Sequence, residues 1–108
     1  MQTPDTILDE IRHNRALLMQ SVGLLEQTQL AAAHAALELQ AAEAHEMAQS
    51  EGSIPDRKNA ALLATLELRR AADVAEAAHQ RVKAQIKATE HALVSLQSEL
   101  RHARESGA

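Results

Sequence analysis

The chain of 108 residues contains no cysteine, phenylalanine, tyrosine or tryptophan, and it has only two prolines and three glycines. The absence of cysteine excludes disulfides, thiolate metal sites and cysteine nucleophiles. Aromatic side chains normally supply much of the buried area of a globular core. Their absence therefore favours a repetitive aliphatic interface between helices over a globular core.

Long hydrophobic runs are also missing. No apolar stretch approaches the roughly 20 residues that are needed to cross a bilayer. The opening Met-Gln-Thr-Pro-Asp is polar and lacks the basic region of a signal peptide. We therefore expect a soluble, cytoplasmic protein without a membrane partner.

The residues that are present favour helices throughout. Alanine fills 23 positions. With leucine, glutamate, glutamine, arginine and lysine it makes up a strongly helix-forming composition. The β-branched residues are few and scattered, so no strand is predicted. The sequence therefore predicts an all-α fold.

Two proline-containing breaks divide the chain into segments of about equal length. They predict one helix over about residues 4–50, a turn over about 51–54 and a second helix over about 55–105. A turn of only a few residues makes the two helices antiparallel neighbours. Residues 1–108 are therefore expected to form a single domain, a long antiparallel two-helix coiled-coil hairpin.

Capping residues mark the ends of these helices. Thr3 can cap the first helix, with Pro4 at the first helical position. Gly52 can take the left-handed conformation that ends a helix. Ser53, followed three residues later by Asp56, resembles a capping box at the start of the second helix.

Apolar residues at alternating spacings of three and four predict which faces meet, as in a coiled coil. With a fold at residues 52–53, the numbers of facing residues add up to about 104 or 105. The stripe of the first helix is Leu8, Ile11, Arg15, Leu18, Val22, Leu25, Gln29, Ala32, Ala36 and Leu39. The stripe of the second helix is Leu68, Ala72, Ala75, His79, Val82, Ile86, Thr89, Leu93, Leu96, Leu100 and Ala103. The predicted pairs include Leu8–Leu96, Ile11–Leu93, Leu18–Ile86, Val22–Val82 and Ala32–Ala72.

Several leucines lie outside these stripes. A helix that is apolar on several faces is usually covered by more than one neighbour. Two hairpins packed as a two-fold four-helix bundle would cover these leucines, and so would a partner protein on the same surface. We therefore predict a homodimer or a protein partner of unknown identity. The residues predicted for this surface are Leu17, Leu24, Leu30, Leu37, Leu62, Leu63 and Leu66.

The net charge of −4 is unevenly distributed. Residues 1–52 carry two basic and eight acidic side chains, whereas residues 53–108 carry nine basic and seven acidic ones. The basic residues of the second helix could engage the phosphates of a nucleic acid. Acidic residues lie among them, and no aromatic side chain is available to stack on bases, so a solvated face is favoured. The residues of the nucleic-acid alternative are Arg69, Arg70, Arg81, Lys83 and Lys87.

Histidine offers the main candidate for metal chemistry. Bundles that bind two metal ions use Glu-x-x-His motifs with further glutamates from other helices. Glu76 and His79 have this spacing, and Glu26 lies near the expected level of the first helix. Glu76 and Glu26 are displaced from the predicted interface, so a hydrogen-bonded interface histidine is favoured over a metal site, and no cofactor is expected.

Catalytic motifs are absent from the sequence. There is no glycine-rich phosphate loop and no Gly-x-Ser-x-Gly turn. A pair of helices also lacks the concave pocket in which active sites are usually built. The protein is therefore predicted not to be an enzyme.

The segment 56–64, Asp-Arg-Lys-Asn-Ala-Ala-Leu-Leu-Ala, opens the second predicted helix. Its Lys-Asn-Ala opening resembles that of small helical-hairpin coiled-coil proteins from phage and prophage DNA-metabolism gene clusters. The resemblance covers about ten residues and the general architecture. It implies an accessory factor that binds a phage or host protein, and it implies no catalytic residue.

These observations favour a non-enzymatic protein–protein interaction or scaffolding module. Two alternatives stay open at this stage. One is a nucleic-acid-associated accessory factor that uses the basic residues of the second helix. The other is a metal-binding four-helix bundle.

Overall fold

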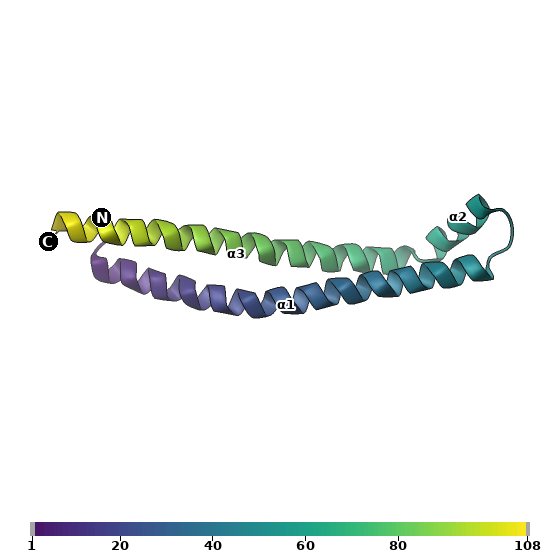
Figure 1. Cartoon of the computed structure of the whole chain (residues 1–108), viewed down its shortest axis with the longest axis horizontal. Helices are drawn as coiled ribbons and strands as arrows, with labels where there is room; N and C mark the ends of the chain where they lie inside the picture. The colour runs from purple at the N-terminus through teal and green to yellow at the C-terminus, as the bar shows by residue number, and fades with distance from the viewer. Residues whose placement is uncertain (1, 108) are drawn as a thin grey trace. The chain divides into compact units, whose positions relative to one another are not determined.

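A computed structural model describes residues 2–107, which form an all-α helical hairpin with no strand in that range (Figure 1). The helices are α1 (Pro4–Gln49), α2 (Ile54–Ala64) and α3 (Leu66–Gly107). No helix within the described range is apolar over enough of its length to cross a membrane. The predicted all-α hairpin class is confirmed.

The start of α1 follows the predicted cap. The backbone N–H of Thr6 donates to Thr3 Oγ1 at 3.3 Å, and the N–H of Ile7 donates to the Thr3 carbonyl at 3.0 Å. These bonds satisfy donors that have no partner inside the first turn. Pro4, which has no N–H to satisfy, occupies the first helical position.

The turn between α1 and α2 also uses the residues that the sequence indicated. Gly52 has a φ of 107°, in the region that side chains with a Cβ rarely adopt. Ser53 caps α2, and its side chain accepts a hydrogen bond from the N–H of Asp56 at 3.4 Å. Pro55 lies in the first turn of α2, where its missing N–H costs nothing.

The turn yields a test with an internal control. A Cβ added at Gly52 would lie 3.2 Å from Asp56 Oδ2 in addition to the unfavourable φ, whereas nothing lies within 4 Å of a Cβ added at Gly23. We expect Gly52→Ala to lower the free energy of unfolding by about 1–2 kcal/mol. Gly23→Ala should raise it by about 0.5–1 kcal/mol, because alanine is the better helix former. Urea denaturation followed by circular dichroism measures both, and equal stabilities would contradict this account of the turn.

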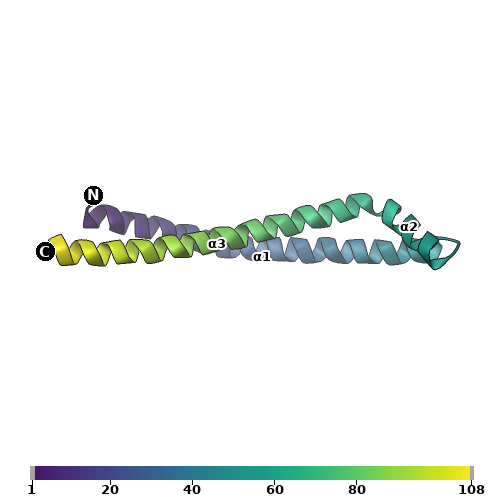
Figure 2. The ribbon, with the colours of Figure 1, turned by 90° about the horizontal axis from the view of Figure 1, so that it is seen from above.

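The predicted second helix is interrupted, so the expectation of one helix over residues 55–105 is wrong. Thr65 leaves the helical conformation, with φ −112° and ψ 15°. Its Oγ1 donates to the Ala61 carbonyl at 2.7 Å, and its N–H donates to the same carbonyl at 3.1 Å. Thr89 makes the same kind of bond, to the Gln85 carbonyl at 2.9 Å, inside the continuous helix α3, so the bond accompanies the break at Thr65 and is not sufficient to produce it. Figure 2 shows that α2 is inclined to the first turns of α3.

The chain divides into two compact units, which we describe separately. Unit 1 comprises residues 1–26 and 81–108, and unit 2 comprises residues 27–80. Of unit 1, residues 2–26 and 81–107 are described. Its core is a cluster of large aliphatic side chains between α1 and α3. The buried members are Ile7, Ile11, Leu93, Leu96 and Leu100, with Leu8, Leu18 and Ala103 partly buried against them.

The predicted face of α3 is confirmed residue by residue. Every position of that stripe, from Leu68 to Ala103, is buried or half-buried. Leucine, isoleucine and valine dominate the part of the stripe that lies in unit 1, whereas the part in unit 2 consists of Leu68, Ala72, Ala75 and His79. The helix-period pattern was therefore sufficient to orient α3.

The predicted face of α1 is correct at six of its ten positions. Leu8, Ile11, Leu18, Leu25, Ala32 and Leu39 face inward as expected. The other four positions are displaced by one residue, on a repeat that runs through the buried Ile7. The side chains that turn inward are Asn14, Ser21, Thr28 and Ala35, in place of Arg15, Val22, Gln29 and Ala36.

Small polar side chains can occupy the α1 face because their hydrogen bonds are made. Asn14 Nδ2 donates to the Glu10 carbonyl at 2.8 Å, and Ser21 Oγ donates to the Leu17 carbonyl at 2.8 Å. Buried polar groups with such partners avoid most of the cost of losing water. Ser21 is thus only 2% exposed, whereas the adjacent Val22 is 52% exposed.

Candidate interaction surface

The interior of unit 2 is built mainly from alanine. Ala61 is the single fully buried apolar side chain within residues 27–80. The half-buried positions of α1 and α3 in this unit include six alanines and only three large apolar residues. The alanines are Ala32, Ala35, Ala42, Ala72, Ala75 and Ala78, and the large apolar residues are Leu39, Met47 and Leu68.

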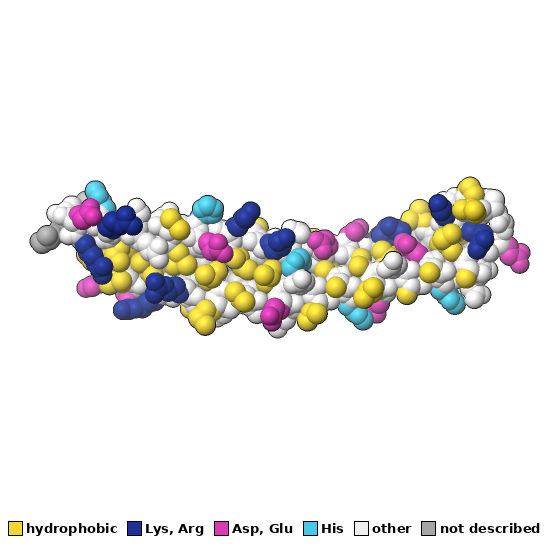
Figure 3. Space-filling view, in the orientation of Figure 1, with side chains coloured by type: hydrophobic (Ala, Val, Ile, Leu, Met, Phe, Trp, Pro, Cys, Tyr) yellow, Lys and Arg dark blue, Asp and Glu magenta, His cyan; other side chains and the backbone are white. Residues whose placement is uncertain are grey.

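Large apolar side chains instead lie on the outside of unit 2. Seven of the eleven exposed large hydrophobic residues of the described chain belong to it. Figure 3 shows hydrophobic side chains at the molecular surface over α1 and α2. Unit 2 therefore buries small residues and exposes large ones, the reverse of what a stable isolated core requires. The seven residues are Leu30, Leu37, Ile54, Leu62, Leu63, Leu66 and Val74.

The total accessible surface agrees with this imbalance. The chain exposes 7954 Å². A compact monomeric protein of 11.7 kDa exposes about 5,900 Å². The difference of about 2,000 Å² exceeds the roughly 800 Å² that each partner contributes to a protein–protein interface of standard size.

The leucines predicted for an interaction surface are mostly exposed. Leu24, Leu30 and Leu37 on α1 are exposed, and so are Leu62 and Leu63 on α2 and Leu66 at the start of α3. Leu17 is half-buried. Leu62 and Leu63 precede the break at Thr65, and Leu66 follows it.

The sequence interpretation missed several apolar residues of this kind. Val22 was placed inside the interface and is exposed, and Met19, Ile54, Val74 and Val94 were not considered. Two of them could have been found from the sequence. Ile54 is the first residue of the helix after the turn. Val74 lies two residues from the inward-facing Ala72 and therefore on the opposite side of α3.

Polar contacts attach α2 to the end of α1. Arg57 Nε and Nη2 donate to the Met47 carbonyl at 3.0 and 2.9 Å. Arg69 on α3 forms a salt bridge with Glu43 on α1. These bonds cross between helices, whereas the described ion pairs Arg12–Asp9 and Arg70–Glu67 and the contact between His34 and Glu38 lie within single helices. The Arg57 bonds thus link α2 to α1, and the Arg69 salt bridge links α3 to α1.

The metal candidates are not assembled into a site. His79 Nδ1 lies 3.0 Å from Thr28 Oγ1, a hydrogen bond between α3 and α1. Glu76 accepts a hydrogen bond from Gln80 Nε2 at 2.8 Å, and Glu26 is exposed. Across residues 2–107, no group of three or more histidine or acidic side chains is placed to hold a metal ion. The environment of His79 is that of an interface histidine with a polar neighbour.

The basic candidates for a nucleic-acid interface are divided between the two units. In unit 2, Arg69 is paired with Glu43 and Arg70 with Glu67. In unit 1, Arg81, Lys83 and Lys87 are exposed. The two pairings in unit 2 neutralise cations that phosphate contacts would require.

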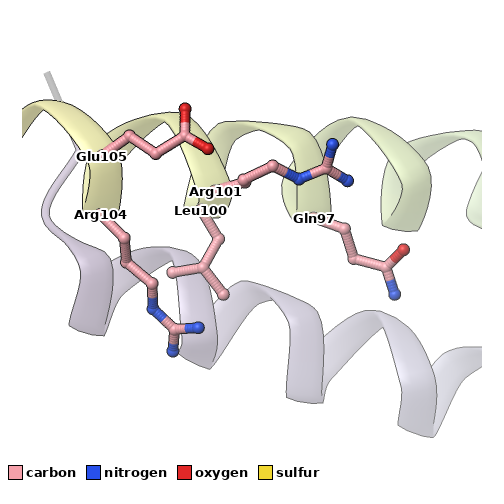
Figure 4. Close-up of a pocket in the computed structure, with 5 residues that line it drawn as sticks. All are labelled: Gln97, Leu100, Arg101, Arg104 and Glu105. Carbon is pink, nitrogen blue, oxygen red and sulfur yellow. The ribbon is translucent and has the colours of Figure 1, made fainter.

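Open depressions flank the core of unit 1. One has a volume of about 400 Å³ and is lined by Gln97, Leu100, Arg101, Arg104 and Glu105. Leu100 and Arg104 point from α3 toward α1, and Arg101 lies along α3 (Figure 4). Arg101 and Arg104 make this depression basic, and Glu105 is the single acidic residue among those that line it.

No protein-family model, curated protein or solved structure gives a significant match to this chain.

Proposed function

We propose that the protein is a non-enzymatic interaction or scaffolding module that works as a homodimer and binds a second protein. The observation that supports this proposal is the inverted packing of unit 2, with alanine inside and large apolar side chains outside. Exposed apolar patches of this kind are typical of surfaces that another protein covers. Two hairpins that share these surfaces would form a four-helix bundle.

The partner surface that we propose surrounds the break at Thr65. Leu62, Leu63 and Leu66 are 42%, 68% and 50% exposed and lie within five residues of one another. Arg57 and Arg69 hold the surrounding helices in place. A rigid cluster of large aliphatic side chains provides apolar anchors at low entropic cost. The resemblance of segment 56–64 to small phage hairpin proteins makes a phage or host protein the partner class to test first.

The proposal is tested by capture with matched variants. The parent protein, a Leu62→Glu, Leu63→Glu double variant and a Val94→Glu control are immobilised and exposed to proteins of the native host. We expect a partner that the parent and the Val94→Glu control retain and that the double variant loses. Val94 is a suitable control because it is 65% exposed and lies in unit 1. Identical binding by all three proteins would contradict the proposed surface.

A further inference from the structure

The outer side of α1 in unit 2 carries almost no charge. Residues 27–37 include no aspartate, glutamate, lysine or arginine. A helix face in contact with water normally carries charged side chains. The corresponding stretch of α3 in unit 2 does so, with Arg69, Arg70, Asp73 and Glu76.

Five exposed residues form a regular stripe on this side of α1. Each inward-facing residue of α1 in this unit lies two positions from a stripe residue, about 200° around a helix of 3.6 residues per turn. Alternating spacings of three and four residues repeat every seven, as in a coiled-coil seam. We call this the α1 outer stripe, and it consists of Leu30, Ala33, Leu37, Gln40 and Ala44.

We propose that a second copy of the chain packs on the α1 outer stripe in the antiparallel direction. The two-fold axis passes near residue 35, so Leu37 of one copy packs on Ala33 of the other, and Leu30 packs beside Gln40. This assignment rests on the proposed dimeric function and specifies its interface. It separates the self-association face on α1 from the partner face formed by Leu62, Leu63 and Leu66.

The lack of charge and the sizes of the side chains in the α1 outer stripe support a second copy of the chain as its binding partner. An uncharged face leaves no charge unpaired when it meets another uncharged face. Antiparallel packing places each Leu37 over an Ala33, and a large residue over a small one fills space without voids. The surplus surface of about 2,000 Å² per chain is ample for an interface of ordinary size.

Charge also favours the antiparallel direction over the parallel one. Unit 2 carries eight acidic and four basic side chains. Parallel packing about the stripe would bring each Glu38 next to its own copy, and like charges at such a distance repel. Antiparallel packing brings Glu38 beside the alanines near residue 32 instead, and it also opposes the two helix dipoles.

The interface leaves the exposed leucines on either side of Thr65 uncovered. Leu62, Leu63 and Leu66 do not belong to the α1 outer stripe, so a dimer presents two copies of these leucines. A partner with two binding segments would then bind with an avidity well above that of either site alone.

Light scattering of the purified full chain tests whether the α1 outer stripe is the surface through which two copies associate. We expect the parent and a Val74→Glu control to have twice the mass of one 11.7 kDa chain, and Leu37→Glu to have the mass of one chain. Val74 is 60% exposed on α3 of the same unit. Circular dichroism should show equal helix content in all three. A dimeric Leu37→Glu variant, or a parent that is monomeric at tens of micromolar, would overturn the proposal.

Disulfide cross-linking tests whether the two α1 helices run antiparallel. Because the chain has no native cysteine, any disulfide must form between the introduced cysteines. Ala33→Cys and Leu37→Cys proteins are oxidised separately and as an equal mixture. We expect a covalent dimer in the mixture only, because residue 33 of one copy meets residue 37 of the other. If each variant alone cross-links as much as the mixture does, the two copies are parallel and the proposal is overturned. If the mixture does not cross-link, the stated register is wrong. An Ala71→Cys protein, exposed on α3, controls for random collision. Both assays use only this chain, so their outcome is independent of whether the partner surface on α2 is correct.

Discussion

Ser21→Glu is expected to lower the free energy of unfolding by about 3 kcal/mol or more, whereas Val22→Glu should change it by less than about 1 kcal/mol. Ser21 is 2% exposed between α1 and α3, and its hydroxyl is bonded to the Leu17 carbonyl. A carboxylate at this position would be buried without a cationic partner. Val22 is 52% exposed, so a glutamate there reaches water.

Chemical denaturation of both variants at equal protein concentration measures this difference. The two positions are adjacent, so helix propensity and overall charge are matched. The comparison also distinguishes the two possible faces of α1. If Val22→Glu proved the more damaging substitution, α1 would have to be rotated to the face that the apolar pattern predicted.

Leu96→Ala is expected to lower the free energy of unfolding by about 2–5 kcal/mol. Leu96 is 8% exposed and belongs to the core cluster of unit 1 with Ile7 and Leu100. Truncation removes apolar contacts and leaves a cavity that two rigid helices fill poorly. Because small domains are stable by only about 5–15 kcal/mol, this is a large fraction of the total.

Val94→Ala provides the control for this substitution. Val94 lies two residues from Leu96 on the same helix and is 65% exposed. Alanine is the better helix former, so we expect no loss of stability within about 0.5 kcal/mol. Equal losses for the two variants in urea denaturation would show that the core of unit 1 does not lie where the structure places it.

The α3 face could be predicted because its apolar residues match the helical period without competition. Val82, Ile86, Leu93, Leu96 and Leu100 have no apolar alternative at the same spacing. The face of α1 could not, because two overlapping stripes compete. Val22 is more apolar than Ser21, and hydrophobicity alone selects the wrong one. Ser21 is accommodated because its hydroxyl bonds to its own helix, an effect that depends on backbone geometry.

The break at Thr65 was missed for a related reason. Threonine is tolerated within helices, and neither proline nor glycine marks this position. At the break, the Thr65 hydroxyl bonds to the Ala61 carbonyl, and Thr65 is 2% exposed. The pattern of apolar residues does not contain this information. The exposed leucines of the candidate surface could be predicted, since they were the residues left over once the stripes were assigned.

Hydrogen exchange measured as a function of protein concentration tests the central claim, that unit 1 is held by its own core whereas unit 2 depends on a second copy. On dilution, amides within residues 27–49 and 66–80 should lose protection, because the α1 outer stripe becomes uncovered. Amides within residues 4–26 and 81–107 should keep theirs. Protection in unit 2 that is independent of concentration and equal to that of unit 1 would contradict the claim.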